Sequence, residues 1–232
     1  CRHLLDMGQP QAGTPLKDID INGQRYGSLY LYFISLAAEI IRHLDATGIT
    51  HPRILEIGGG YGFLTGLLKA YFGARATMFS MELPESMMLQ EWYLRSIFPD
   101  VSTCFKATEE PMIFQDDGLN FINANVYESQ DFEFDVAINI ISMCEMTGEV
   151  ATKYIGYVEK NISADGIFLF VNSYGRGHGS VTDVPEYDFD EYWTLADATP
   201  LYSFEVAQAS EMMRLLLKRT SRRQNRETRR FL

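Results

Sequence analysis

The sequence predicts an α/β fold built on an open, mostly parallel sheet with helices on both faces. Three features carry this prediction. The short run Ile54–Ile57 leads into a cluster of glycines and then into a helix candidate at Phe63–Phe72. A second strand candidate, Ala76–Met81, ends at an acid, and Phe134–Ile141 is the strongest strand candidate of the chain. Strand candidates that alternate with helix candidates are typical of a parallel sheet.

The length and composition indicate one principal domain. The chain has 232 residues, and 46% of them are hydrophobic, which is ordinary for a globular protein. We expect an N-terminal lid or helical extension over 1–50, a ligand-binding domain over 51–220 and a basic tail over 221–232. Because the chain begins with Cys1 rather than Met, we expect a fragment or a processed form.

Composition also excludes several partners and locations. No segment approaches the ~20 apolar residues of a membrane span, so none is expected. The three cysteines are scattered, as free thiols are in a reducing compartment, which favours a cytoplasmic protein. A net charge of −11 argues against nucleic acid as a partner. A homo-oligomer is left open.

The charge is uneven, because residues 214–232 hold eight Lys or Arg and one acid, Glu227. Such a segment is either a solvated tail or a contact with an acidic surface, including the chain's own acidic body.

The glycine cluster lies in a strand-to-helix turn. Four glycines occur within the five residues Gly58–Gly62, directly before the helix candidate. Glycine allows a tight turn and a close approach of the main chain to a ligand. The first turn of the following helix offers free N–H groups. The sequence therefore predicts a ligand site at this turn.

The spacing of the glycines narrows the kind of ligand. A dinucleotide fingerprint is Gly-x-Gly-x-x-Gly, and its third slot is occupied here by Phe63. The pattern is instead acid-x-Gly-x-Gly-x-Gly, carried by Glu56, Gly58, Gly60 and Gly62. It resembles the first motif of the class I S-adenosylmethionine (SAM)-dependent methyltransferases. The alternative is a glycine-rich turn in some other α/β protein.

This resemblance implies a Rossmann-like class I methyltransferase fold, with a seven-stranded, mostly parallel sheet, a terminal antiparallel hairpin and SAM as the cofactor. Glu82 follows the second strand at the distance that suits the ribose hydroxyls. Asn125, at the end of a third strand, is placed to contact adenine, and Ser142 and Met143 follow the central strand at the same sheet edge. The expected cofactor contacts are Glu56, Gly58, Gly59, Gly60, Tyr61, Gly62, Glu82, Leu83, Asn125, Val126, Ser142 and Met143.

The remaining elements follow from periodicity and from turn residues. Residues 1–24 are predicted to form a loop or lid. Helices are expected at Leu29–Leu44, Ser86–Phe98, Val150–Ile162 and Asp188–Leu195. Further strands are expected at Val101–Phe105, Leu119–Val126, Ile167–Val171, Leu201–Val206 and Met212–Lys218.

Three stretches together resemble a narrower family, the bacterial putative sugar O-methyltransferases. They are Glu56–Gly62, then Glu82–Glu85 with the sequence Glu-Leu-Pro-Glu, and Phe134–Met146, which ends in Ser-Met-Cys-Glu-Met. Glu82 stands where that family usually has Asp. The resemblance implies transfer of a methyl group to a hydroxyl of a sugar or a glycoconjugate precursor.

A sugar hydroxyl is a poor nucleophile, so a general base is expected. His178 lies in the polar loop after the predicted strand at Ile167–Val171, and its unperturbed pKa suits that role. Glu145 is the alternative base. Asn172, Tyr174 and Arg176 are expected to bind the acceptor. No cluster of ligands predicts a metal.

Three other functions stay open. They are a non-catalytic SAM-binding module of a larger protein, a methyltransferase for another small molecule, and an NAD(P) oxidoreductase. Phe63 and the predicted terminal strand pair disfavour the last of these.

Overall fold

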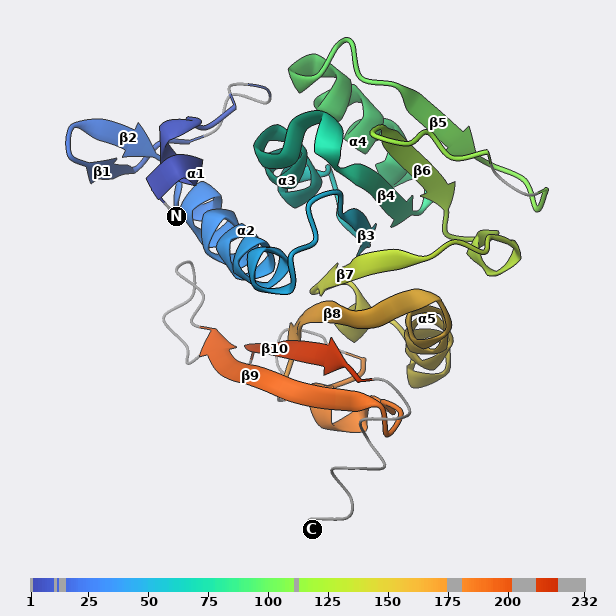
Figure 1. The fold of residues 1–232 in the computed structure, drawn as a ribbon. Helices are drawn as coiled ribbons and strands as arrows, with labels where there is room; N and C mark the ends of the chain where they lie inside the picture. Colours follow the sequence, from blue (N-terminus) through green and yellow to red (C-terminus); the bar gives the residue numbers. More distant parts are fainter. Residues whose placement is uncertain are drawn as a thin grey trace. The chain divides into compact units, whose positions relative to one another are not determined.

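The computed structural model describes residues 2–10, 12, 16–110, 113–174, 181–201 and 212–220. The chain forms two compact units (Figure 1). The first consists of Cys1–Pro52 and Gly59–Tyr127, and the second of Arg53–Gly58 and Glu128–Leu232. Each unit is described separately below.

Among the described residues, the larger sheet has eight strands, so the expected number of seven is wrong. The strand expected at Val101–Phe105 is present as β5 (Thr103–Lys106), which pairs in parallel with β6 (Leu119–Asn123) at the edge of the sheet. As an edge strand, β5 has a partner on one side only among the described strands.

In the first unit, β4 (Thr77–Glu82) pairs in parallel with β6, with Met78 opposite Leu119 and Glu82 opposite Asn123. The helices α3 (Phe63–Phe72) and α4 (Pro84–Ile97) both lie beside β4 (Figure 1). All six residues of β4 are buried, as expected for a parallel strand that is covered on both faces. Only Leu83 separates the carboxyl end of β4 from the start of α4.

Local sequence explains where these helices begin. Gly62 precedes α3 in a left-handed conformation, with φ of 87°. Pro84 is within the first turn of α4, where its missing N–H is not needed. Both the predicted helix at Phe63–Phe72 and a helix after Glu82 are confirmed; the latter begins at Pro84 rather than Ser86.

The N-terminal part of the first unit is more regular than expected. It contains the short helix α1 (Arg2–Asp6) and an antiparallel hairpin of β1 (Ile19–Ile21) and β2 (Gln24–Tyr26). The predicted loop over 1–24 is therefore wrong in part. The long helix α2 (Ser28–Thr47) follows and packs on α3, and the 3-10 helix η1 (Gly73–Arg75) follows α3.

In the second unit, β3 (Arg53–Ile57), β7 (Phe134–Ile140) and β8 (Ile162–Ser173) form a parallel sheet. The helix α5 (Gly148–Asn161) lies between β7 and β8 in the sequence, and Thr147 caps it by accepting from the Val150 N–H. The 3-10 helix η3 (Met143–Glu145) lies between β7 and α5 in the sequence, and η4 (Val184–Glu186) comes after β8. The 3-10 helix η2 (Tyr127–Ser129) spans the point in the sequence where the first unit ends and the second resumes.

The terminal antiparallel pair is present, but its first strand begins earlier than expected. The strand β10 (Met212–Arg219) pairs antiparallel with both β8 and β9 (Trp193–Leu201). The predicted helix at Asp188–Leu195 is wrong, because Trp193 pairs with Arg219 and Thr194 with Lys218. This pairing overrides the local aromatic spacing. The predicted strand residues 202–206 lie outside the described residues.

Basic residues of β10 contact acids of their own unit. Arg214 pairs with Asp197 at 2.7 Å and Lys218 with Asp165 at 3.8 Å. Arg219 pairs with Asp190 at 2.5 Å. The part of the basic segment that the structure describes thus contacts the chain's own acids, while 221–232 lies outside the described residues. Among the described residues, no helix combines the length and apolar character that crossing a membrane requires.

Candidate functional site

The glycine loop of the first unit is a tight main-chain turn. The Gly62 N–H donates to the Gly59 carbonyl at 3.0 Å, and the Gly62 carbonyl accepts from the Gly66 N–H at 2.8 Å. Gly60 and Gly62 have φ of 57° and 87°, which L-residues rarely adopt. The loop therefore needs glycine at these positions for conformational reasons.

Glu82 is the acid that the structure brings to this loop. It is the last residue of β4, and its side chain is buried. One carboxylate oxygen accepts from the Gly60 N–H at 2.7 Å, and the other accepts from the Leu83 N–H at 2.9 Å. Burial raises the pKa of Glu82, and the two N–H bonds act in the opposite direction. The glycine loop is thus hydrogen-bonded to the end of β4 through the Glu82 carboxylate.

The turn after β6 lies beside the same strand end. The Ala124 N–H donates to the Glu82 carbonyl at 2.8 Å, and the Asn123 side chain accepts from the Asn125 N–H at 2.9 Å. Asn125 is exposed, and Leu83 is exposed as well. The predicted strand reaching Val126 ends at Asn123, so Asn125 and Val126 lie in a turn. Within this unit the structure brings together the glycine loop, Glu82 and Asn125.

Gln90 and Ser80 lie behind the glycine loop, and sequence reasoning missed both. The Ser80 hydroxyl donates to the Gln90 side chain at 2.5 Å. Both residues are buried, and Gln90 is 0% exposed. The sequence signal that could have identified Gln90 is a polar residue on the inner face of the amphipathic helix α4.

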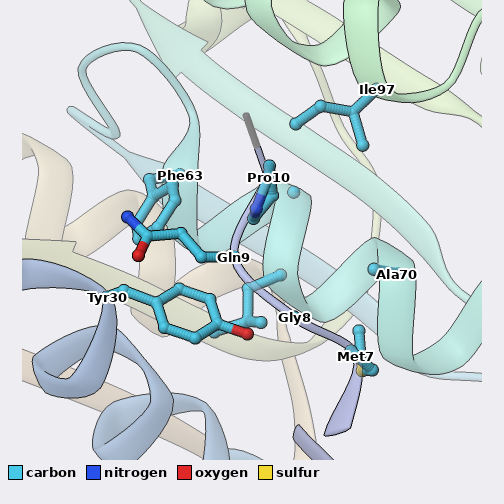
Figure 2. Close-up of a pocket in the computed structure, with 10 residues that line it drawn as sticks. Met7, Gly8, Gln9, Pro10, Tyr30, Phe63, Ala70 and Ile97 are labelled. Atoms are coloured by element: carbon cyan, nitrogen blue, oxygen red, sulfur yellow. The ribbon is translucent and has the colours of Figure 1, made fainter. Parts of the chain in front are cut away.

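A cavity of about 320 Å³ lies between the N-terminal segment and α3. Figure 2 shows Tyr30 and Phe63 on one side of it and Ala70 and Ile97 on the other. The Gly27 N–H donates to the Gln9 side chain at 2.8 Å, and this bond ties the segment to the start of α2. Tyr30 donates to the Leu4 carbonyl at 3.1 Å, and burial, followed by the effect of Tyr26, raises its pKa to about 12. The N-terminal segment thus lines this cavity together with α3, and its role as a lid stays a prediction.

In the second unit, Gly58 ends β3 with φ of 69°, and a side chain there would collide with Ser142. The Asn139 amide donates to the Ile57 carbonyl at 2.9 Å and to the Ser142 hydroxyl at 2.6 Å. Gly58 and Ser142, both predicted cofactor contacts, are thus adjacent. Glu56 and Met143 are buried in this unit.

Two buried asparagines join the strand ends of the second unit. The Asn172 amide donates to the Asn139 side chain at 2.9 Å and accepts from the Cys144 N–H at 3.0 Å. Asn139 also accepts from the Met143 N–H at 3.3 Å, and both asparagines are 0% exposed. Sequence reasoning did not single out Asn139, although a polar residue within a buried strand is the kind of signal that marks such a network.

The structure describes only some of the predicted catalytic and acceptor-binding residues. Glu145 is exposed, and its N–H donates to the Ser142 carbonyl at 3.2 Å. Tyr174 is exposed at the end of the described part of the loop after β8. His178 and Arg176 lie outside the described residues. Ile141, between β7 and Ser142, has φ of 68°, which is strained for a β-branched residue.

No protein family and no curated protein matches the sequence. Solved structures do match. The structure of the mitomycin 7-O-methyltransferase MmcR is 11% identical, with a TM-score of 0.53 over 84% of this chain. This chain spans 55% of the length of that enzyme.

Two further structures are similar over most of both chains. Magnesium protoporphyrin IX methyltransferase (ChlM) from Synechocystis PCC 6803, with bound SAM, has a TM-score of 0.57 and 11% identity over 88% of this chain and 86% of its own. A SAM-dependent methyltransferase from Clostridium acetobutylicum ATCC 824 has a TM-score of 0.53 and 13% identity over 82% of this chain and 92% of its own. The protein therefore has the Rossmann-like α/β fold of these methyltransferases.

Proposed function

We propose that the protein is a SAM-dependent methyltransferase that transfers a methyl group to a hydroxyl of a sugar or glycoconjugate precursor. The observation that carries the proposal is Glu82, a buried carboxylate held against the glycine loop by the Gly60 N–H. An acid in this position is suited to accept hydrogen bonds from two vicinal ribose hydroxyls. The fold of the similar structures agrees with it.

The residues of the first unit fit the nucleoside part of SAM. Each Glu82 oxygen accepts one bond from the main chain and keeps further lone pairs for hydroxyl donors. The exposed side chain of Leu83 offers an apolar contact for a ribose or adenine face. Asn125, in the neighbouring turn, is assigned to the adenine edge. Gly59, Tyr61, Gly62 and Val126 complete the proposed contacts in this unit.

Open space at Gly60 supports the same assignment. Apart from Gly60 and its two chain neighbours, no described residue has an atom within 4 Å of a Cβ added at Gly60, whereas one at Gly62 would lie 2.6 Å from Gln90. One side of the loop is therefore packed and the other side is free for a ligand. The predicted contacts of the second unit, Glu56, Gly58, Ser142 and Met143, stay predictions.

Bound SAM supplies an activated methyl group. The protein's own residues then have to hold the acceptor oxygen in line with that group and take up its proton. Glu145, which is exposed beside Ser142, is the described candidate for the base, and His178 is the alternative. Tyr174 and Arg176 are proposed to bind the acceptor. The Asn172 amide is buried and bonded at both ends, so we leave it out of the acceptor contacts.

The sugar acceptor rests on the resemblance of Ser142–Met146 and the two shorter stretches to the sugar O-methyltransferases. The similar structures include enzymes named for mitomycin and for magnesium protoporphyrin IX, so the fold itself accommodates very different acceptors.

The test is a calorimetric titration of the whole chain with S-adenosylhomocysteine (SAH), and NADH is the control. Micromolar binding of SAH alone supports the proposal, and a screen for methyl transfer to nucleotide sugars and glycans then follows. Binding of SAH without turnover on any acceptor would favour a non-catalytic module. Binding of NADH instead of SAH would overturn the proposal in favour of an oxidoreductase.

A further inference from the structure

Gln90 of α4 has one end of its side-chain amide without a hydrogen-bond partner among the described residues. Ser80 of β4 bonds to the oxygen end at 2.5 Å, and the nitrogen end is buried and unpartnered. The nitrogen end of this fully buried side chain therefore has no partner among the described residues.

The unpartnered end faces the glycine loop. A Cβ added at Gly62 would lie 2.6 Å from Gln90 Cγ and 3.2 Å from Gln90 Nε2. The amide therefore lies directly against the main chain of Gly62. On its other side it contacts Ser80, two residues before Glu82 on the same strand. Gln90 thus connects the glycine loop with the strand that presents the buried acid.

An unpartnered buried amide is unfavourable for the folded protein, and an apolar side chain of the same length would avoid that cost. Asn120, also in the first unit, shows the usual arrangement. Its buried amide donates to the Met78 and Gln115 carbonyls and accepts from the Gln115 N–H. Groups that break this rule are expected at functional sites.

We propose that Gln90 is a positioning residue for the cofactor. It holds the glycine loop in register with Glu82, and its second amide end bonds to the main chain of Gly59–Gly62 when the cofactor binds. Ser80 orients the amide for this contact. The inference rests on the proposed function, because the loop is assigned to SAM there.

The test compares Gln90→Met with Asn120→Leu in the whole chain. For Gln90→Met we expect at least a tenfold higher SAH Kd and a melting temperature equal to or above that of the wild type. Asn120→Leu, the matched buried amide, is expected to melt at a lower temperature and to keep its SAH Kd within twofold. An unchanged SAH Kd in Gln90→Met would overturn the inference.

A second readout separates this inference from the proposed function. At saturating SAH, hydrogen exchange of the Gly60 and Gly62 amides is expected to be at least fivefold faster in Gln90→Met than in the wild type, because only the wild type forms the added bond to the loop. SAH binding with equal exchange in the two proteins would contradict the positioning role and leave the assigned ligand standing. Failure of the wild-type protein to bind SAH would instead overturn the assigned ligand, and this inference with it.

Discussion

The two units end their central strands in different ways. At the end of β4, in the first unit, main-chain N–H groups surround one buried carboxylate, and Glu82 keeps acceptor capacity beyond those bonds. At the ends of β7 and β8, in the second unit, the amides of Asn139 and Asn172 have bonds at both of their ends, to each other and to main-chain groups. The Glu82 carboxylate can therefore accept further hydrogen bonds from a ligand, whereas the two asparagine amides already use their hydrogen-bonding groups within the fold.

This difference separates binding from stability. Buried polar groups that are fully bonded stabilise the fold, because loss of one partner leaves several groups without bonds. Groups with unused capacity contribute less to folding and are available to a ligand. We therefore expect substitutions in the asparagine network to change stability most, and substitutions around Glu82 to change affinity most.

Asn139→Leu should have the largest effect on stability. It leaves the Met143 N–H and the Asn172 amide nitrogen without their partner and leaves the Ile57 carbonyl only the Ser142 hydroxyl at 3.3 Å, and buried groups cost about 1–3 kcal/mol each when unpaired. Allowing for relaxation, we expect a loss of about 3 kcal/mol in urea unfolding. The exposed Asn125→Ala is the control and should change stability by less than about 0.5 kcal/mol. A loss below about 1 kcal/mol for Asn139→Leu would show that the network is not structural.

The two loop glycines should differ from each other. Gly62→Ala combines a positive φ with a collision against Gln90, and we expect a loss of about 2 kcal/mol in thermal or urea unfolding. Gly60→Ala has the strained φ but open space, so about 1 kcal/mol is expected. Its methyl group points into the proposed ligand space and should weaken SAH more than Gly62→Ala does. Equal effects of both substitutions on stability would contradict the packing difference.

The raised pKa of Glu82 predicts a pH dependence. The folded state holds this proton more tightly than the unfolded chain does, so the contribution of Glu82 to stability falls as pH rises from 4.5 through the raised value. The ionised carboxylate is the better hydroxyl acceptor, so SAH affinity should rise over the same window, by roughly tenfold. Titrations at several pH values test this expectation, and Glu82→Gln should remove the dependence. Affinity that is flat with pH in the wild type would be inconsistent with it.

Relief of strain at Ile141 should have the smallest effect. A left-handed conformation costs an L-residue ~1–2 kcal/mol, and glycine loses ~0.5–1 kcal/mol of that gain through its greater freedom when unfolded. Ile141 is exposed, so little packing is lost, and Ile141→Gly should gain about 0.5 kcal/mol. The preceding Ile140→Gly, in regular strand β7, should instead lose stability. A comparable loss in both variants would mean that the φ of Ile141 carries no strain.

Local signals predicted most of the first unit. The glycines before Phe63 and the proline after Leu83 act within a few residues, so the sequence indicates α3, β4 and the acid at the end of β4. Elements that depend on distant partners were harder to predict. The start of β9 at Trp193 is set by pairing with Arg219, and no local periodicity reports that contact.

The same reasoning applies to the candidate site. Glu82 is predictable because its place after the strand is a matter of spacing. Gln90 is not, because its role depends on Ser80 across a helix-strand contact and on the space beside Gly62. The bond between Asn139 and Asn172 joins residues 33 positions apart, and only the parallel pairing of β7 with β8 brings them together.

The central claim is that Glu82 holds the ribose of SAM, and the most direct measurement is the SAH Kd of Glu82→Gln. The variant keeps the shape of the side chain and loses its charge. We expect its Kd to be at least tenfold higher than that of the wild type, or about 1.4 kcal/mol, because the amide NH2 end cannot accept a hydrogen bond from a ribose hydroxyl. The control Glu145→Gln, at an exposed acid, should bind SAH like the wild type. An SAH Kd in Glu82→Gln equal to that of the wild type would contradict the account.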